Sequence, residues 1–270
     1  MRSLVGVFRE PEYSPGRVDD DAAILERTRD ALAARGLTMR LGGIELLADG
    51  APAAVLAMCQ SDRALAVLDR AAAAATVMNH PNAIRACHRH ETIRRLTAAG
   101  TPFPATRIVP TATERPRGAR APCWVKRGDV HAMTTDDVVF APTREALDAT
   151  LADFAARGIT HAALQTHVEG VVVKFYGVAD GRFFRCYTRE GAVPAPIPAL
   201  WSVAHAGAAA LGLDVFGGDL VVTPDGRPFL IDVNDWPSFA RCRDEAADAI
   251  AGYAIDRLID VAPAAQGQHG

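Results

Sequence analysis

The stretch FGGDLVVTPDGRPFLIDVNDWPSF, residues 216–239, holds the pattern from which we predict the fold and the chemistry of this chain. Two apolar runs flank PDGR (224–227), whose proline, aspartate and glycine favour a tight turn between antiparallel strands. Side chains alternate along a strand, so Asp232 and Asn234 share one face, and a hairpin brings Asp219 opposite them. The stretch therefore predicts a β-hairpin on which three oxygen-bearing side chains converge.

These three side chains suit a divalent metal ion. Carboxylate and amide oxygens are the ligands that Mg²⁺ prefers, and a site with few protein ligands leaves room for water and phosphate oxygens. We therefore predict that Asp219, Asp232 and Asn234 bind one or two Mg²⁺ ions, or Mn²⁺ in the same place. The alternative is structural: the two aspartates would end strands and the asparagine would make a turn.

Lysine is rare in this chain. Among 29 basic residues only two are lysines, Lys126 in CWVKRGD and Lys174 in VVVKFYGV, and both lie in apolar runs that predict strands. An unpaired charge inside such a strand is costly, whereas an anionic ligand removes the cost, and phosphate attracts a compact ammonium strongly. We predict that both lysines contact phosphate oxygens. The alternative is that both point outward from edge strands.

Length and composition limit the class of protein. The chain has 270 residues, of which 49% are hydrophobic and 23% are charged, as in a globular protein with one large or several small domains. The net charge of −3 argues against a nucleic-acid partner and against attachment to an anionic membrane. The apolar runs are too short for a membrane span or a signal peptide, and the five scattered cysteines indicate reduced thiols. We therefore expect a cytoplasmic protein, of undetermined oligomeric state.

The order of predicted elements changes along the chain. Strands and helices alternate over the first 80 or so residues, which predicts a small parallel sheet, and one long helix is expected over 80–100. From residue 123 onward, short strands and a second turn, ADGR (179–182), predict antiparallel sheets with helices. The predicted fold class is therefore α/β plus α+β. We place the bounds at 1–75 for the N-terminal α/β domain, 76–162 for a helix and a central subdomain, 163–262 for a C-terminal antiparallel subdomain and 263–270 for a disordered tail.

The order of these features resembles that of the ATP-grasp superfamily. The resemblance is carried by NHPNAIRAC, WVKRGD, ALQTHVEG, VVVKFYGV and the hairpin quoted above, and it runs from about residue 75 to 245. The chain has neither a GxxxxGK[ST] nor a GxGxxG loop, so a nucleotide would have to be held in another way. The resemblance implies the ATP-grasp fold, in which ATP and Mg²⁺ lie between two α+β subdomains that follow a smaller domain.

The resemblance also implies a role for each matching residue. Lys126 would contact the ATP phosphates, while Lys174 and Arg189 would face the transferred phosphoryl group as catalytic residues, with Lys174 also contacting ATP. His90 stands where the superfamily often has another ATP-contacting lysine. The segment between the two subdomains would bind adenine and ribose, through Gln165, Thr166, His167, Val168 and Glu169.

The activity implied most directly is that of a carboxylate–amine ligase. In such enzymes ATP phosphorylates a carboxylate, and an amine then attacks the acyl phosphate to form an amide. The acceptor would be a small molecule or a peptide. The loops SPGRVDDD (14–21) and RGDVHAMTTDD (127–137) are candidate acceptor and lid segments, since glycine and short polar residues tolerate movement.

An ATP-grasp small-molecule kinase is the alternative. The spacing from Lys126 to His131 is similar to that of the ATP-grasp inositol-polyphosphate kinases, in which the histidine lies near the acceptor, and Ser238 stands where those kinases tend to have glycine. His131 and Ser238 are therefore candidate substrate-binding residues. Residues 1–75 contain no lysine and no dense arginine cluster, which argues against a polyphosphate acceptor. A third alternative, a nucleotide-binding module without catalysis, is disfavoured because the predicted metal ligands are all present.

Overall fold

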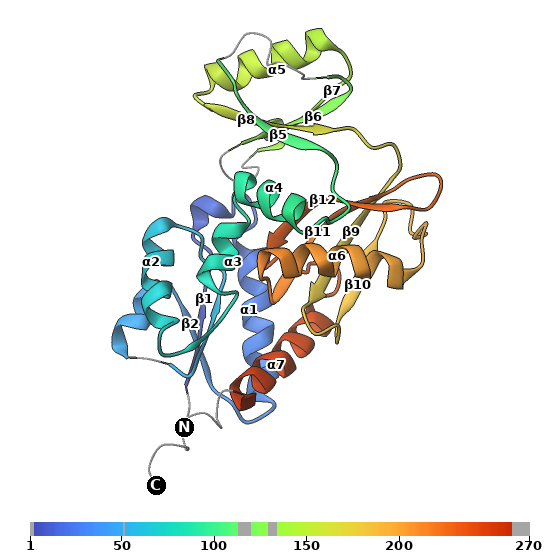
Figure 1. The fold of residues 1–270 in the computed structure, drawn as a ribbon. Coiled ribbons are helices and arrows are strands. Elements are labelled where there is room, and N and C mark those ends of the chain that lie inside the picture. Colours follow the sequence, from blue (N-terminus) through green and yellow to red (C-terminus); the bar gives the residue numbers. More distant parts are fainter. Residues whose placement is uncertain (1–2, 51, 113–119, 129–133, 261–270) are drawn as a thin grey trace.

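The computed structural model describes residues 3–50, 52–112, 120–128 and 134–260, which form three sheets and their covering helices (Figure 1). One sheet is parallel and two are antiparallel, which confirms the predicted fold class. The predicted tail at 263–270 lies outside the described residues. Within them, no helix has both the length and the apolar character needed to cross a membrane.

The N-terminal sheet is parallel, in the order β2-β1-β3-β4. Alternate residues of its two central strands face opposite layers: Leu4 and Leu56 pack with α1, and Val5 and Val55 pack with α2. Covering on both faces explains why these two strands are apolar throughout. The sequence analysis did not find β2, a short edge strand. The elements are β1 (Leu4–Val7), η1 (Pro11–Tyr13), α1 (Val18–Ala33), β2 (Met39–Gly42), η2 (Ile44–Asp49), β3 (Ala54–Ala57), α2 (Asp62–Ala71) and β4 (Thr76–Met78).

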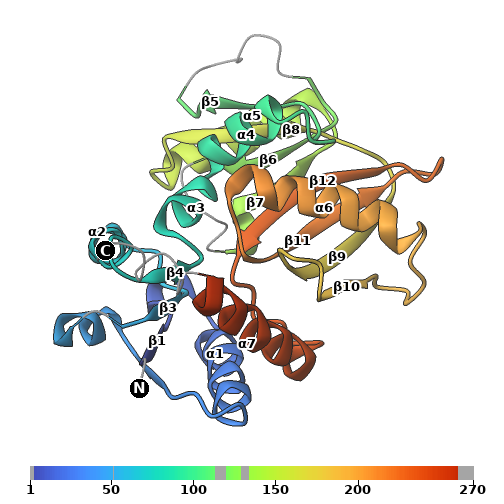
Figure 2. The ribbon, with the colours of Figure 1, turned by 60° about the horizontal axis from the view of Figure 1, so that its bottom comes forward.

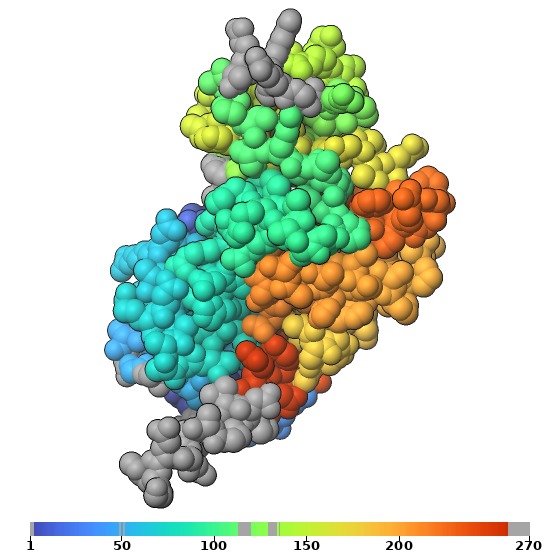
Figure 3. Space-filling view, viewed as in Figure 1, coloured from blue at the N-terminus to red at the C-terminus, as the bar shows by residue number. Residues whose placement is uncertain are grey.

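The single helix predicted over 80–100 is wrong. The chain forms α3 (Pro81–Ala86) and α4 (Arg89–Ala98), separated by Cys87 and by His88, whose backbone is extended. The Thr92 hydroxyl donates to the Ala86 carbonyl at 2.9 Å, which satisfies an acceptor at the end of α3. Figure 3 shows this teal and green segment between the blue N-terminal domain and the orange α6.

The central sheet is antiparallel, in the order β5-β8-β6-β7, and α5 covers one of its faces. The boundary predicted between the central and C-terminal subdomains, after residue 162, falls within strand β8. The first two residues of the strand lie before this boundary and the rest lie after it. The elements are β5 (Thr106–Pro110), β6 (Cys123–Arg127), η3 (Thr135–Asp137), β7 (Val138–Ala141), α5 (Arg144–Ala156) and β8 (His161–Thr166).

The C-terminal sheet is antiparallel, in the order β10-β9-β11-β12, and α6 packs on one face. Both predicted hairpins are present, with Gly181 and Gly226 at positive φ in their turns. The last helix, α7, was not predicted and packs beside α1, as both ribbon views show (Figures 1 and 2). The elements are β9 (Val171–Val178), β10 (Phe184–Tyr187), α6 (Ile197–Leu211), β11 (Val215–Val222), β12 (Pro228–Asp235) and α7 (Arg243–Asp260).

One buried amide joins the N-terminal sheet to the C-terminal sheet. Asn79 follows β4 and is fully buried. Its amide nitrogen donates to the Val215 carbonyl at 2.8 Å, and its amide oxygen accepts from the backbone nitrogens of Asp214 and Val215 at 2.7 and 2.8 Å. The start of β11 is therefore tied to the end of β4 by a single side chain.

We expect Asn79→Ala to lower the free energy of unfolding by about 3 kcal/mol, since the backbone nitrogens of Asp214 and Val215 lose their acceptor and the Val215 carbonyl loses one of its two donors. Urea denaturation should show a lower midpoint with an unchanged slope. Asn82→Ala, at an exposed position of α3, is the matched control and should change the midpoint little. Equal midpoints for the two variants would contradict this role of Asn79.

Candidate active site

A β-bulge shapes one wall of the cleft between the central and C-terminal sheets. In the ladder of β11 with β12, Leu220 pairs with Leu230 but Asp219 pairs with Asp232, which leaves Ile231 as an extra residue. The extra residue reverses the alternation, so Leu230 packs in the core while both Ile231 and Asp232 face the cleft. The hairpin predicted from the sequence is present, and its bulge decides which residues reach the cleft.

The carbonyl of the bulged residue meets the central sheet. Lys126 Nζ on β6 donates to the Ile231 oxygen at 2.8 Å, and Gln165 Nε2 on β8 lies 3.5 Å from the same atom. Lys126 is buried, and burial lowers the pKa of its ammonium to about 8, against the attraction of the Asp232 carboxylate. Since an ammonium has three donors, one carbonyl leaves it able to bind an anion in the cleft.

The three predicted metal ligands come together on this wall. Asp219 and Asp232 are directly paired, and Asn234 Nδ2 donates to Asp232 Oδ2 at 2.8 Å. Burial raises the pKa of Asp219, Lys174 opposes the rise from 3.1 Å, and the charge of Asp232 adds to it. Two carboxylates that disfavour each other's charge, with an amide beside them, are a donor set that fits Mg²⁺. The described residues contain no group of three or more His, Cys, Asp and Glu side chains that would hold a metal by themselves. Water and phosphate oxygens would therefore complete the coordination.

An arginine that the sequence analysis missed also lies in this cleft. Because α4 starts anew after His88, Arg89 is almost buried and donates to Asp232 Oδ1 at 3.1 Å, while its Nε has no hydrogen-bond partner. The side chain of His90, at the position where a phosphate contact was expected, is 63% exposed and lies 4.0 Å from Glu91. Arg89 therefore occupies the cleft in place of His90.

The cleft encloses a cavity of about 360 Å³. Part of its lining is apolar, from Trp124, Val138, Val172 and Ile231. The other part is charged or polar, from Arg89, Lys126, Gln165, Asp219, Asp232 and Asn234. Such a lining suits a ligand with a flat apolar part and a highly charged part.

Solved structures are similar over nearly the whole chain, whereas comparison with protein-family models and with curated proteins found no match. The RimK domain protein ATP-grasp from Sphaerobacter thermophilus DSM 20745 is 20% identical, with a TM-score of 0.68 over 94% of this chain and 99% of that one. D-alanine–D-alanine ligase from Bacillus anthracis, complexed with ATP, is 12% identical, with a TM-score of 0.69 over 96% and 97%. The ATP-grasp ligase PsnB, complexed with precursor peptide PsnA2 and AMPPNP, is 17% identical, with a TM-score of 0.65 over 95% and 96%.

The chain has the ATP-grasp fold. At these identities the likeness shows the fold and not the reaction. The parallel sheet and the two antiparallel sheets are consistent with this fold, and we call the cleft between the two antiparallel sheets the ATP-grasp cleft.

The residues predicted to bind adenine and ribose occupy different surroundings. Gln165 is buried and lines the ATP-grasp cleft. Thr166, its neighbour on β8, lines a smaller cavity of about 210 Å³ together with Arg107. His167 Nδ1 accepts a hydrogen bond from Trp124 Nε1 at 3.2 Å. Val168 and Glu169 follow in the connection to β9, where Val168 is half-buried and Glu169 is exposed.

The remaining predicted residues are spread more widely. Lys174 is half-exposed on β9 and pairs with Asp219, so it does not lie inside an apolar core. Arg189 is exposed after β10 and, within the described part of the chain, forms no ion pair. Ser238 lines a second cavity, described next. His131 lies outside the described residues. The assignments of Arg189 and His131 stay predictions.

A second cavity, of about 450 Å³, adjoins the ATP-grasp cleft where the N-terminal domain meets the end of β12. Lys174 and Asn234 belong to its wall. The loop that the sequence marks as a candidate acceptor segment contributes Ser14, Arg17 and Asp21. We call this space the junction cavity.

We expect the stability of the protein to depend on the charge of Lys126. Its pKa of about 8 in the folded state is below the ordinary value of 10.5, so the unfolded chain binds the proton more tightly. The free-energy cost of burying the charged ammonium is present below pH 8 and is relieved as the pH rises towards 10.5. Relative to Lys126→Met, the wild-type free energy of unfolding should therefore rise by about 3 kcal/mol between pH 7 and pH 10.5.

Urea unfolding of both proteins over this pH range is the measurement. Gln165→Met is the matched control, because it removes the other donor near the Ile231 oxygen without removing a charge. Parallel curves for wild type and Lys126→Met would show that the ammonium carries no such penalty.

Proposed function

We propose that the chain is an ATP-dependent carboxylate–amine ligase. The observation that supports the proposal is the convergence of cations on the acidic pair Asp219 and Asp232 in the cleft of an ATP-grasp fold. Arg89 and Lys126 line the cleft, and Lys174 pairs with Asp219 from the adjoining junction cavity. Alternating positive and negative groups in one cleft suit a nucleotide triphosphate together with a divalent cation.

The lining of the cleft suggests how ATP would lie. Trp124, Val138 and Val172 offer apolar surface for the adenine ring, and Gln165 offers a polar edge. Lys126 Nζ donates to one carbonyl and has two further N–H groups, and Arg89 Nε has no hydrogen-bond partner among the described residues. Both side chains would therefore donate to phosphate oxygens. Both cations are almost buried, so phosphate oxygens would also offset the cost of their desolvation.

The protein would hold Mg²⁺ through Asp219, Asp232 and Asn234. When bound, Mg²⁺ would neutralise charge on the phosphates. Asp219 has a raised pKa because of burial, and a cation beside it would favour its ionised form. Lys174 pairs with Asp219 on the acidic wall and also lines the junction cavity. It would therefore contact both Asp219 and the phosphoryl group that is transferred.

The reaction would proceed in two steps whose atoms balance. A carboxylate oxygen of the acceptor attacks the γ-phosphorus, and ADP leaves with the bonding electron pair. An amine then attacks the acyl carbon, phosphate leaves, and the amine loses a proton to give the amide. The side chains position the reactants and neutralise charge, and no covalent bond to the protein is required.

Two observations favour a ligase over a kinase. The relatives in fold include D-alanine–D-alanine ligase and the ligase PsnB, both named for bond formation. Two arginines of the first 75 residues, Arg9 and Arg17, line the junction cavity, and Arg9 is already bound to Asp21 and to backbone carbonyls. A polyphosphate acceptor would need more uncommitted positive charge than this cavity offers.

We expect Asp232→Asn to lower ATP turnover by about 100-fold or more, because it removes one carboxylate of the metal site from the wall that faces the phosphates. ADP formation in the presence of an acid and an amine is the measurement. Asp225→Asn, in the exposed turn of the same hairpin, is the matched control and should turn over like the wild type. Unchanged turnover in Asp232→Asn would contradict the metal assignment.

The fate of the phosphate distinguishes the two reactions. With ATP and a pool of small acids and amines, a ligase releases inorganic phosphate only when both classes are present. We expect this result. Phosphate retained in a stable product of a single hydroxyl compound would support the kinase instead.

A further inference from the structure

A network of buried charged groups lies beside the junction cavity, outside the ATP-grasp cleft. At its centre is Arg9, which follows β1 and is almost buried. Its Nη1 donates to Asp21 Oδ2 at 3.1 Å, and its Nη2 donates to the backbone oxygens of Asp235 and Trp236 at 3.2 and 2.9 Å. Its Nε lies 3.4 Å from the Met58 oxygen. All three guanidinium nitrogens therefore already have partners.

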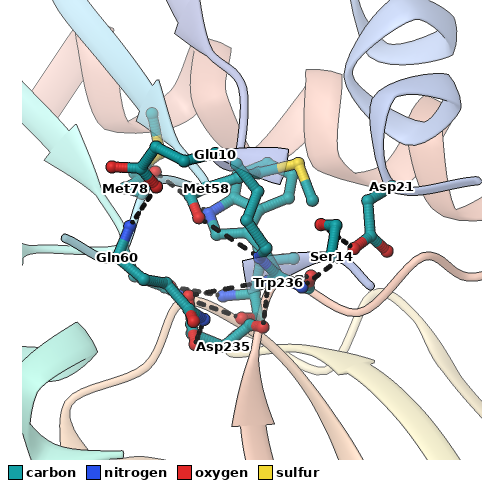
Figure 4. Close-up of polar contacts among 11 residues, drawn as sticks. Glu10, Ser14, Asp21, Met58, Gln60, Met78, Asp235 and Trp236 are labelled. Atoms are coloured by element: carbon teal, nitrogen blue, oxygen red, sulfur yellow. Dashed lines mark hydrogen bonds and ion pairs between the residues drawn. The ribbon is translucent and has the colours of Figure 1, made fainter. Parts of the chain in front are cut away.

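Asp235, the last residue of β12, is less well satisfied. The residue belongs to the wall of the junction cavity, and its side chain is fully buried. Gln60 Nε2 donates to its Oδ1 at 3.0 Å (Figure 4). Its Oδ2 has no hydrogen-bond partner, because Arg9 Nη2 is 3.9 Å away and directed at backbone oxygens. A carboxylate oxygen without a donor is costly in a buried position, so this atom needs a partner.

The charges around this atom do not balance. Two carboxylates, Asp21 and Asp235, pair with the one guanidinium of Arg9. The other cations of the cavity wall, Arg17 and Lys174, form no ion pair with either carboxylate among the described residues. Asp21 also accepts from the Ser14 hydroxyl at 2.7 Å, as Figure 4 shows. With Asp21 taking both the salt bridge at 3.1 Å and this hydroxyl, the carboxylate of Asp235 is the underbalanced member. A cationic donor entering the cavity would satisfy both the missing hydrogen bond and the missing positive charge.

We propose that the junction cavity binds the ammonium group of the amine substrate, and that Asp235 Oδ2 accepts a hydrogen bond from it. This rests on the proposed ligase function and names the residue that would recognise one of its two substrates. Lys174 lies on the wall of the same cavity, so a carboxylate activated beside Lys174 and the ammonium held by Asp235 would share one space. The ammonium would lose one proton to solvent before the neutral amine attacks the acyl carbon. Gln60 acts as a positioning residue, since it orients the carboxylate through Oδ1.

Calorimetric titration of the whole chain, with Mg²⁺ and AMPPNP present, tests the proposal. The probes are the standard L-amino acids, D-alanine, methylamine and ethylamine, with propionate as the counterpart of alanine that lacks only the ammonium. We expect at least one amine to bind, and alanine to bind more tightly than propionate if alanine is among the binders. Asp235→Asn should weaken amine binding about 10- to 100-fold, the effect of losing a charge-assisted hydrogen bond. Asp225→Asn should leave it unchanged.

Thermal melting and AMPPNP affinity report whether Asp235→Asn retains its fold. If that variant does not fold, Gln60→Met, which keeps the charge of Asp235 and removes its orienting donor, should weaken amine binding several-fold. The proposal is overturned if no amine in the panel binds, if propionate binds as tightly as alanine, or if a folded Asp235→Asn binds amines like the wild type.

Turnover, measured separately, keeps this inference distinct from the proposed function. Amine binding that depends on Asp235, without any ATP turnover, would support the amine site and count against the ligase. Turnover that requires an acid and an amine, with an unchanged KM for the amine in Asp235→Asn, would support the ligase and overturn the amine site.

Discussion

The extra residue in β12 is the constraint on which the ATP-grasp cleft depends. Without the bulge, regular pairing from the turn onward would place Ile231 opposite Asp219, and Asp232 would move to the core face. With it, Leu230 stays in the core and Asp232 stays beside Asp219. The carbonyl at the bulge is also where Lys126 reaches across from the central sheet. One inserted residue thus sets both the acidic wall and its contact with the opposite half of the cleft.

Opposite charges are balanced in pairs along this cleft, and each pair comes from separate elements. Arg89 on α4 meets Asp232 on β12, and Lys174 on β9 meets Asp219 on β11. Among the residues that the structure describes, the direct partner of Lys126 is a carbonyl alone, and burial lowers the pKa of its ammonium. The balance changes at the end of β12, where Asp235 and Asp21 share Arg9. The two adjoining cavities therefore differ in how their carboxylates are paired with cations.

Local patterns in the sequence predicted the hairpins and the shared face of Asp232 and Asn234, because side-chain alternation and turn chemistry are local properties. The place of Asp219 beside Asp232 depends on the bulge. The bulge was not predictable, since the sequence does not mark which residue leaves the ladder. The break before Arg89 depends on the Thr92 side chain and on packing against α6, and a helical pattern does not show either. Arg9 and Asp235 are 226 residues apart, so only the folded chain shows that they meet. The charged helix after residue 242 carried a helical pattern that was missed.

The packing of α7 against α1 has a consequence for how the protein folds during synthesis. Ile24 and Leu25 on α1 share a buried cluster with Ile250 and Ala254 on α7. The last helix therefore supplies part of the core of the N-terminal domain. A nascent chain that has emerged only as far as residue 100 would expose the apolar face of α1 to solvent. The N-terminal domain can complete its core only after almost the whole chain has left the ribosome, although translation delivers it first.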